Sequence, residues 1–210
     1  MPRPLKAAAV DSKDRVFRAA ATEFAARGYA GANVDRIARA ARLNKAMIYY
    51  HFKSKAALYR EILRDMFGAV RAAVLEVEAA DATPQEKIRR YVEAIAAAAE
   101  ARPHFPPIWL REIAEGGEHV DAATLAYVRD VLAALGRMID EGRRAGVFVA
   151  MNPLVVQGGI IAPIMFFLAT ARLRQKMARA GAVATAAIPR DLVVTHIQRL
   201  TLAQLEGKIA

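Results

Sequence analysis

The stretch VDRIARAARLNKAMIYYHF, residues 34–52, predicts two short helices joined by a tight turn. Asn33 precedes the first helix as an N-cap, and Asp35 lies in its first turn, where the helix dipole favours an anion. Residues 42–44 leave room only for a turn, and Asn44 can cap the second helix. Apolar residues recur at spacings that turn one face of both helices toward a common core: Ile37, Ala41, Leu43, Ile48 and Phe52. This pattern predicts a helix-turn-helix.

The second helix presents polar groups outward, namely Lys45, Tyr49, Tyr50 and His51, with Lys53 and Lys55 following. Cations, phenol hydroxyls and an imidazole suit the phosphates and base edges of DNA. We expect a base contact at Lys45, because the first turn of a recognition helix points into the major groove. Alternatively, Lys45 is a solvated surface lysine that makes no base contact. The ring of Tyr49 could equally belong to the core. Ala46 and Met47 can contact the DNA through van der Waals contacts or backbone amides. Asn33 can bind a phosphate through its side-chain amide or through the N-terminus of the helix that follows it.

These residues resemble the TetR-type (tetracycline-repressor-like) transcriptional regulators. The resemblance covers Arg15 to about Phe67 and rests on FAARGY at 24–29, IA at 37–38 and IYYHFKSKAAL at 48–58. It implies phosphate contacts from Tyr49, His51 and Lys55, a groove-facing ring at Tyr50, and an inducer bound in a helical C-terminal domain. The chain departs from the family at Arg42, where glycine is usual. Left-handed backbone angles there cost an arginine on the order of 1 kcal/mol, so the turn is either strained or built differently.

Composition and charge agree with an all-α, DNA-binding protein. Few Gly and Pro residues accompany abundant Ala, Leu, Arg and Glu, and no alternating strand pattern occurs in the 210 residues. The formal net charge is +10, and residues 1–60 carry 13 Lys/Arg against 4 Asp/Glu. Nearly all the excess therefore lies with the helix-turn-helix, where a basic run favours nucleic acid over a merely solvated face.

We predict two domains joined by a long helix. Residues 1–57 form a three-helix DNA-binding domain, with 1–11 disordered, and residues 58–210 form a helical ligand-binding and dimerisation domain. The first helix begins near Asp11 and ends at Gly28, and the long fourth helix runs from Lys55 to Glu78 after a Ser54 cap. Further helices are expected at 84–101, 108–115, 120–144, 153–172 and 189–205, with a kink or break at Pro163. Gly181 weakens any helix through the Ala-rich segment 175–188.

Aromatic and Met residues of the second domain are candidates for an inducer pocket, although such residues at helical spacing are often plain core. They are Tyr91, Phe105, Trp109, Tyr127, Met151, Met165 and Phe166, with Arg111 and Glu112 as polar anchors or as a surface pair. Catalysis has weak support. Two pairs have the one-turn spacing that could start a metal site, namely Glu115 with His119 and Glu100 with His104. Neither pair has a third metal ligand nearby. We therefore expect no enzyme, no cofactor and no metal site.

Two uncharged stripes predict a homodimer interface. The first stripe comprises Leu154, Val155, Gly158, Ile161, Ala162 and Met165. The second comprises Leu192, His196, Leu200 and Ala203. The resemblance implies that the last two major helices of two subunits pair into a four-helix bundle. A monomer would expose both stripes to water. The predicted partners are thus an operator duplex, a second copy of the chain, and a small-molecule effector.

Residues 147–171 contain no charge and are long enough to span a bilayer. This leaves a membrane-associated helical protein as the alternative class. Against it, Asn152-Pro153, Gly158-Gly159 and Pro163 interrupt the segment, and we expect no membrane partner. The chain has no cysteine, which excludes disulfides and cysteine nucleophiles, and its N-terminus lacks an apolar signal-peptide region. We expect a cytoplasmic protein.

Overall fold

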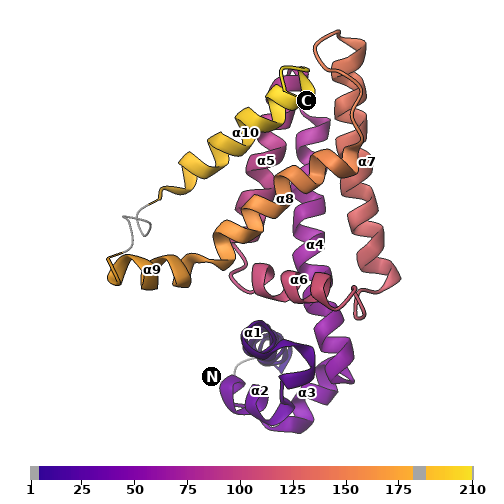
Figure 1. The fold of residues 1–210 in the computed structure, drawn as a ribbon. Coiled ribbons are helices and arrows are strands. Elements are labelled where there is room, and N and C mark those ends of the chain that lie inside the picture. The colour runs from indigo at the N-terminus through magenta and orange to yellow at the C-terminus, as the bar shows by residue number, and fades with distance from the viewer. Residues whose placement is uncertain (1–4, 182–187, 210) are drawn as a thin grey trace.

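The structure is a computed structural model that describes residues 5–181 and 188–209, and within these ranges it is entirely helical (Figure 1). The helices are α1 (Leu5–Gly31), α2 (Val34–Ala41), α3 (Lys45–Phe52), α4 (Lys55–Ala79), α5 (Pro84–Glu100), α6 (Phe105–Ala114), α7 (Ala122–Arg144), α8 (Pro153–Ala169), α9 (Ala171–Arg179) and α10 (Arg190–Leu205). The all-α prediction is confirmed.

The helix-turn-helix is built as its capping residues predict. The Asn33 side chain accepts a hydrogen bond from the backbone N–H of Asp35 at 2.7 Å, and the Asn44 side chain accepts one from Met47 at 3.0 Å. Ile37 and Ile48 are fully buried where α2 and α3 face α1. These caps satisfy backbone donors that a helix leaves unpaired at its start, so the sequence defines both helices locally.

Helix α1 is longer than predicted. It begins at Leu5 rather than near Asp11, and it continues to Gly31 across a break at Gly28, where φ is 70° and ψ is 177°. Residues 1–4 of the lead that we expect to be disordered lie outside the described residues.

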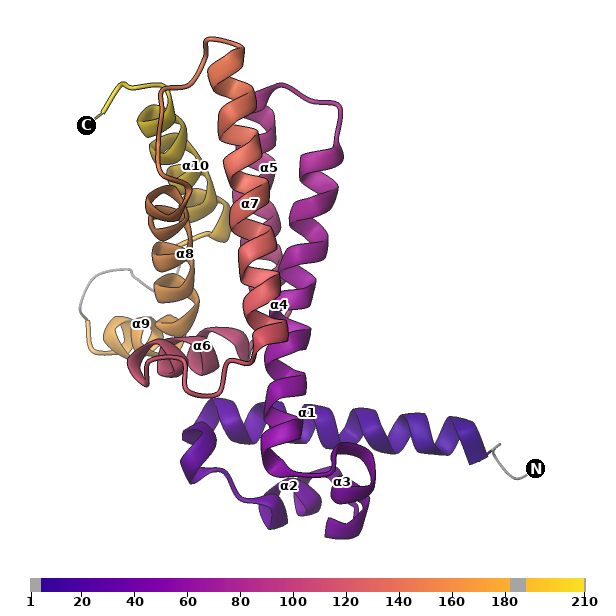
Figure 2. The ribbon, with the colours of Figure 1, turned by 90° about the vertical axis from the view of Figure 1, so that its right-hand side faces the viewer.

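Helix α4 joins the two parts of the molecule. Its lower end crosses α1 near α3, and its upper length packs against α5 and α7 (Figure 2). Helices α8 and α10 pack against each other on the far side of α5 and α7. The short helix α6 contacts both α8 above it and α1 below it, so it is a second bridge between the domains.

Two helix starts in the second domain follow from proline chemistry. Thr83 accepts a hydrogen bond from the Glu86 N–H at 3.3 Å and Pro84 opens α5, as predicted. Helix α6 starts at Phe105 rather than at Ile108, with Pro106 and Pro107 in its first turn. Proline is tolerated there because the first helical N–H groups have no partner within the helix.

The uncharged helix ends at Thr170 rather than breaking at Pro163. The Thr170 hydroxyl donates to the carbonyl of Phe166 at 2.7 Å, and Arg174 donates to that of Phe167, so the last carbonyls of α8 are satisfied there. Helices α8 and α9 then meet at 51°. Within the described ranges no single helix is long and apolar enough to cross a membrane, and α8 with α9 meets that requirement only as this bent pair. The predicted segment 175–188 lies partly in α9 and partly outside the described residues.

Candidate nucleic-acid interface and ligand cavity

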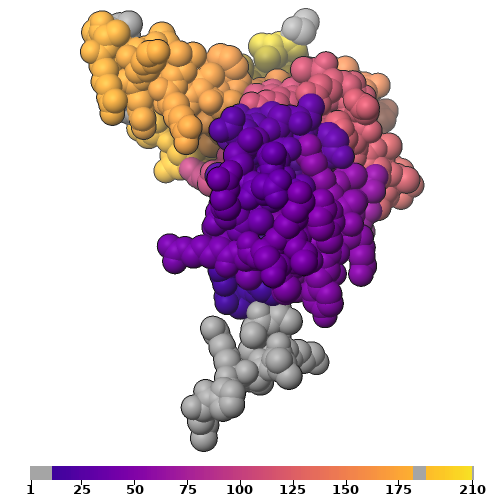
Figure 3. Space-filling view, turned by 90° about the horizontal axis from the view of Figure 1, so that it is seen from below, coloured from indigo at the N-terminus to yellow at the C-terminus, as the bar shows by residue number. Residues whose placement is uncertain are grey.

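The outward face of α3 carries the predicted DNA contacts. Tyr49 is 41% exposed and Tyr50 is 68% exposed, whereas Ile48 and Phe52 point into the core. The alternative of a core role for Tyr49 is therefore excluded. Ala46 is exposed and Met47 is half-buried beside them. Seen from below, residues of α1–α4 fill the near face of the molecule, and α9 projects to one side (Figure 3).

Lys45 is paired with an acid of the neighbouring helix. Its Nζ lies 3.1 Å from Oδ1 of Asp35, and the two side chains are 48% and 60% exposed. An exposed ion pair of this kind contributes only about 0–1 kcal/mol. Lys45 can therefore exchange Asp35 for a base acceptor at little cost.

His51 and Lys55 are held more tightly than the sequence predicts. His51 Nε2 lies 2.8 Å from the hydroxyl oxygen of Ser12 on α1. Lys55 Nζ lies 4.6 Å from the ring centroid of Tyr29 and 3.5 Å from the Ala30 carbonyl oxygen. Both side chains thus link α1 to the helices that follow it. Their roles as phosphate contacts remain predictions.

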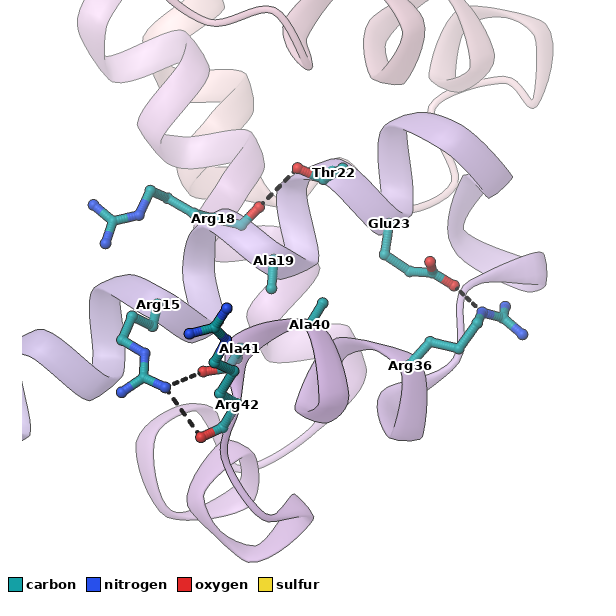
Figure 4. A pocket seen from close by; sticks show the side chains of 9 residues that line it. All are labelled: Arg15, Arg18, Ala19, Thr22, Glu23, Arg36, Ala40, Ala41 and Arg42. Carbon is teal, nitrogen blue, oxygen red and sulfur yellow. Dashed lines mark hydrogen bonds and ion pairs between the residues drawn. The ribbon is translucent and has the colours of Figure 1, made fainter.

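The turn between α2 and α3 is strained at Arg42. Its backbone angles, φ 55° and ψ 45°, are left-handed, so the first of the two possibilities raised by the sequence is correct. Arg15 on α1 donates to the carbonyl oxygen of Arg42 at 3.0 Å and to that of Ala41. The turn closes one end of an open groove of about 660 Å³ between α1 and α2 (Figure 4). Sequence reasoning missed this groove, although Arg15 and Arg18 share a face of α1.

A second, apolar cavity of about 190 Å³ lies in the C-terminal domain among α4, α6, α7 and α8. Its lining comprises Phe67, Val70, Phe105, Trp109, Val128, Val131, Leu132, Leu154, Gln157, Gly158 and Ile161. Phe105 and Trp109, both predicted for an inducer pocket, are thus brought together, and their role in ligand binding stays a prediction. Leu154, Gly158 and Ile161, predicted for the dimer surface, also line this cavity.

Gln157 is the one amide side chain in that lining, and sequence reasoning did not single it out as a ligand contact. The buried Tyr91 hydroxyl donates to its Oε1 at 2.7 Å, and burial raises the pKa of Tyr91 well above its usual range. The phenol therefore keeps its proton and orients the Gln157 amide. The Nε2 group is the donor that remains for a ligand.

The other predicted pocket residues do not line the cavity. Tyr127 packs beside Gly68, with the Arg71 guanidinium 5.7 Å from its ring centroid. Met165 is 1% exposed in the core of the protomer, and Phe166 is 69% exposed on the surface of α8. Met151 is half-buried against the core. Met165 is also unavailable as a dimer contact, because α8 turns it inward.

Arg111 and Glu112 face the DNA-binding domain instead of the cavity. Arg111 donates to the carbonyl oxygens of Phe24 at 3.1 Å and Ala25 at 2.9 Å. Glu112 is fully buried and accepts a hydrogen bond from the Tyr59 hydroxyl at 2.7 Å. That contact and burial raise the pKa of Tyr59, burial being the larger cause. Helix α6 is therefore bonded to both α1 and α4.

Of the two predicted pairs, Glu115 with His119 stays together, and the expectation that no third ligand lies near it was wrong, because Glu112 of the same helix also faces His119. His119 Nδ1 lies 3.1 Å from Glu112 Oε1, and Glu115 brings a third ligand atom within 4.8 Å of both. Glu112 is already engaged by Tyr59, so the cluster joins α6 to α4. Glu100 bonds Arg190 at 2.7 Å instead of His104. Burial lowers the pKa of His104.

Helices α8 and α10 share an exposed apolar face. Among its members, Leu154, Val155, Phe166, Leu192 and Leu200 are between 48% and 69% exposed, and His196 is exposed among them. The two helices lie side by side in both ribbon views (Figures 1 and 2). Their opposite faces, which include Ile160 and Ile197, are buried in the protomer.

The helix-turn-helix geometry, the exposed recognition helix and the basic N-terminal domain define a DNA-binding protein of the helix-turn-helix class. Comparison with known proteins agrees. A family model described as "Bacterial regulatory proteins, tetR family" matches residues 16–62. Residues 16–62 therefore form a helix-turn-helix domain of the type found in TetR-family transcriptional regulators.

Individual relatives show how far the similarity extends. The repressor NicS of Pseudomonas putida is 26% identical over 139 residues, which cover 65% of this chain and 66% of NicS. The repressor SCO4008 of Streptomyces coelicolor is 48% identical over 52 residues, 25% of this chain and 27% of that one. A tetR-family regulatory protein from Rhodococcus RHA1 has the same fold, with a TM-score of 0.70 at 19% identity over 92% of this chain and 96% of that one. The matched segments thus span less than two thirds of NicS and about a quarter of SCO4008.

Proposed function

We propose that this protein is a ligand-responsive repressor that binds a palindromic operator as a homodimer. The observation that carries the proposal is the outward face of α3, where Lys45, Tyr49 and Tyr50 are exposed on a helix capped at its N-terminus by Asn44. Such a helix enters the major groove with its first turn at the base edges. The excess of positive charge in residues 1–60 supplies the sequence-independent attraction to phosphates.

Selection of bound duplexes from a random pool tests this proposal. Two recognition helices in one dimer must meet successive major grooves about 34 Å apart. We expect an inverted repeat whose half-sites have that separation. The proposed function is contradicted if no sequence is enriched and the protein also fails to bind the DNA upstream of its own coding sequence.

The dimer is supported by the exposed face of α8 and α10. Leu154, Phe166 and Leu192 are each more than 60% exposed on this face. Apolar surface of this kind marks a contact site when it is contiguous. A second copy presenting the same two helices covers it by two-fold symmetry, as in an isologous interface.

The effector site is supported by the cavity beside Trp109. Its volume of about 190 Å³ lies below the usual range of roughly 300–1,000 Å³ for drug-sized ligands. No charged side chain lines it, so a charged ligand would lose its hydration without compensation. The cavity therefore favours a small, uncharged, mostly apolar compound with one acceptor oxygen placed at Gln157 Nε2.

Coupling between cavity and DNA runs through α6 as well as α4. Trp109 lines the cavity, and Arg111 on the same helix bonds the end of the first segment of α1. A ligand that shifts α6 moves α1 with it. Effector and operator then prefer different spacings of the two recognition helices, and each weakens the binding of the other.

A further inference from the structure

The groove between α1 and α2 is lined by four arginines. Arg15 and Arg18 come from α1, Arg36 comes from α2, and Arg42 comes from the turn (Figure 4). Ala19 and Ala40 keep the space between the helices open, and the groove has a volume of about 660 Å³. Such a concentration of cations on the helix-turn-helix has no role in the contacts of α3 described above.

Arg42 adopts a backbone conformation that is unfavourable for an arginine. Its left-handed backbone disfavours any residue with a Cβ by roughly 1 kcal/mol, whereas glycine adopts these angles freely. Local folding therefore favours glycine at this turn. The arginine is better explained by what its side chain does, and in Figure 4 that side chain extends toward Arg15 and Ala19.

Among residues 5–181 and 188–209, only Arg36 of the four groove arginines forms an ion pair. The guanidinium groups of Arg18 and Arg42 have no hydrogen-bond or ion-pair partner in the described part of the chain. Arg15 bonds two backbone carbonyls, which are neutral. The groove's one carboxylate, Glu23, is engaged by Arg36 at 2.6 Å and by Arg27 at 3.6 Å. Like charges gathered in this way repel one another until an anion binds.

We propose that this groove binds the sugar-phosphate backbone of DNA, in addition to the contacts that α3 makes. The inference rests on the proposed DNA-binding function. Guanidinium groups match phosphate oxygens in two-point hydrogen bonds, and Arg18 and Arg42 are both free to make them. The groove ends close to the start of the recognition helix in the chain, because only Leu43 and Asn44 separate Arg42 from Lys45. DNA held at Lys45 therefore brings a strand of phosphates close to the turn.

The shape of the groove favours a polymer over a small phosphorylated ligand. It is open to solvent along the side of the domain (Figure 4), and its lining supplies cations and few groups able to recognise a base or a sugar. A phosphate backbone needs only positive charge and room for a strand.

The test compares wild type with Arg42→Gly and with Arg18→Gln by titrating fluorescent duplexes at several salt concentrations. One duplex is the DNA upstream of its own coding sequence, and the other has random sequence. Arg42→Gly keeps the turn, since glycine suits its backbone, so its midpoint of thermal unfolding should be no lower than that of wild type. The control is Arg144→Gln, which removes one positive charge from the last turn of α7, outside the groove.

Each groove variant should bind both duplexes about three- to tenfold more weakly, with the slope of log affinity against log salt reduced by about one unit per subunit. Arg144→Gln should match wild type. Unchanged slopes in both groove variants, with wild type binding normally, overturn this inference alone. Absence of DNA binding by wild type overturns the proposed function instead. If inorganic pyrophosphate stabilises wild type but not Arg42→Gly while DNA slopes stay equal, the groove takes a small phosphate and the DNA proposal is wrong.

Discussion

The guanidinium of Arg111 lies 3.1 Å from the carbonyl oxygen of Phe24, and this contact ties α6 to the first helix of the DNA-binding domain. Arg111 also reaches Ala25 and Ala26, just before the break at Gly28. Trp109, on the same short helix, lines the apolar cavity. One helix of the second domain therefore contacts both the proposed effector site and α1.

Replacing Arg111 with alanine should uncouple the two sites. We expect effector binding in the cavity and DNA affinity without effector to change less than threefold, because neither surface contains Arg111. Effector-induced release of DNA should fall by about tenfold, as expected when a coupling free energy of roughly 1–3 kcal/mol is lost. DNA titrations with and without effector measure this, with Arg144→Ala as control. A normal release by Arg111→Ala would contradict coupling through α6.

Gln157 should determine which ligands the cavity accepts. Gln157→Leu keeps the approximate volume and removes the amide donor, so affinity for a carbonyl-containing ligand should fall by about tenfold. A ligand of the same shape without the oxygen should bind the variant at least as well as wild type. Thermal-shift titration with such matched pairs of small apolar compounds measures the difference. Equal losses for both ligands would show that Gln157 acts only through packing.

Shortening Trp109 to alanine should change the effector response while leaving the DNA-binding domain intact. The substitution enlarges a cavity that is already present and removes the ring packed edge-on against Phe67 at 4.7 Å. We expect a loss of stability of about 3–5 kcal/mol, an altered ligand preference, and DNA affinity without ligand within threefold of wild type. Chemical denaturation and DNA titration test both parts. A large loss of DNA affinity in the folded variant would contradict this separation.

Leu200 should be required for dimerisation. It is 48% exposed on α10, so Leu200→Glu is expected to fold as a monomer and to place a charge in the proposed interface. Light scattering should show a monomer, and operator affinity should fall more than 100-fold because the two recognition helices no longer act together. Leu125→Glu, on the exposed surface of α7, should remain dimeric. A Leu200→Glu dimer with full affinity would place the interface elsewhere.

Acid should weaken the contact between α4 and the start of α7. Burial opposes ionisation of Asp121, but hydrogen bonds from Arg64 and Thr124 outweigh it and hold the pKa of Asp121 at about 2. Because the folded pKa lies below the ordinary value of 3.8, this stabilisation is present above about pH 4 and is lost as the pH falls toward 2. The free energy of unfolding of Asp121→Asn should therefore depend less on pH in that window. An identical pH dependence in both proteins would contradict this assignment.

Local features of the sequence predicted more of the structure than tertiary features did. Asn33, Asn44, Ser54 and Thr83 all cap the helices they were expected to cap, because a cap depends only on residues two or three positions away. Of the kink or break predicted at Pro163, the break was wrong, since α8 continues through Pro163 and ends at Ala169, next to the hydrogen bonds of Thr170.

The sites were predicted less completely, because they depend on residues far apart in the chain. Phe105 and Trp109, both predicted for an inducer pocket, line the same cavity, but Gln157 is oriented by Tyr91, 66 positions away. The orientation of Arg111 depends on α1, whose contact with α6 no periodicity predicts. The anomaly at Arg42 was visible in the sequence, although its neighbours Arg15 and Arg18 appear only once α1 is packed on α2.

Substitution of Lys45 separates base recognition from phosphate binding. Lys45→Ala should relax the preference for the operator over random DNA by about 1–3 kcal/mol, because it removes a base contact. Lys55→Ala should weaken both duplexes about equally and lower the salt slope by about one unit per subunit. Competition binding on the two duplexes distinguishes these results. An unchanged preference in Lys45→Ala would remove Lys45 from base recognition.

The most direct measurement of the central claim is a titration of the purified chain against the DNA upstream of its own coding sequence at increasing salt. We expect two chains per site, nanomolar affinity at low salt, and a steep linear fall of log affinity with log salt. Binding that is absent, or that does not depend on salt, would contradict the account.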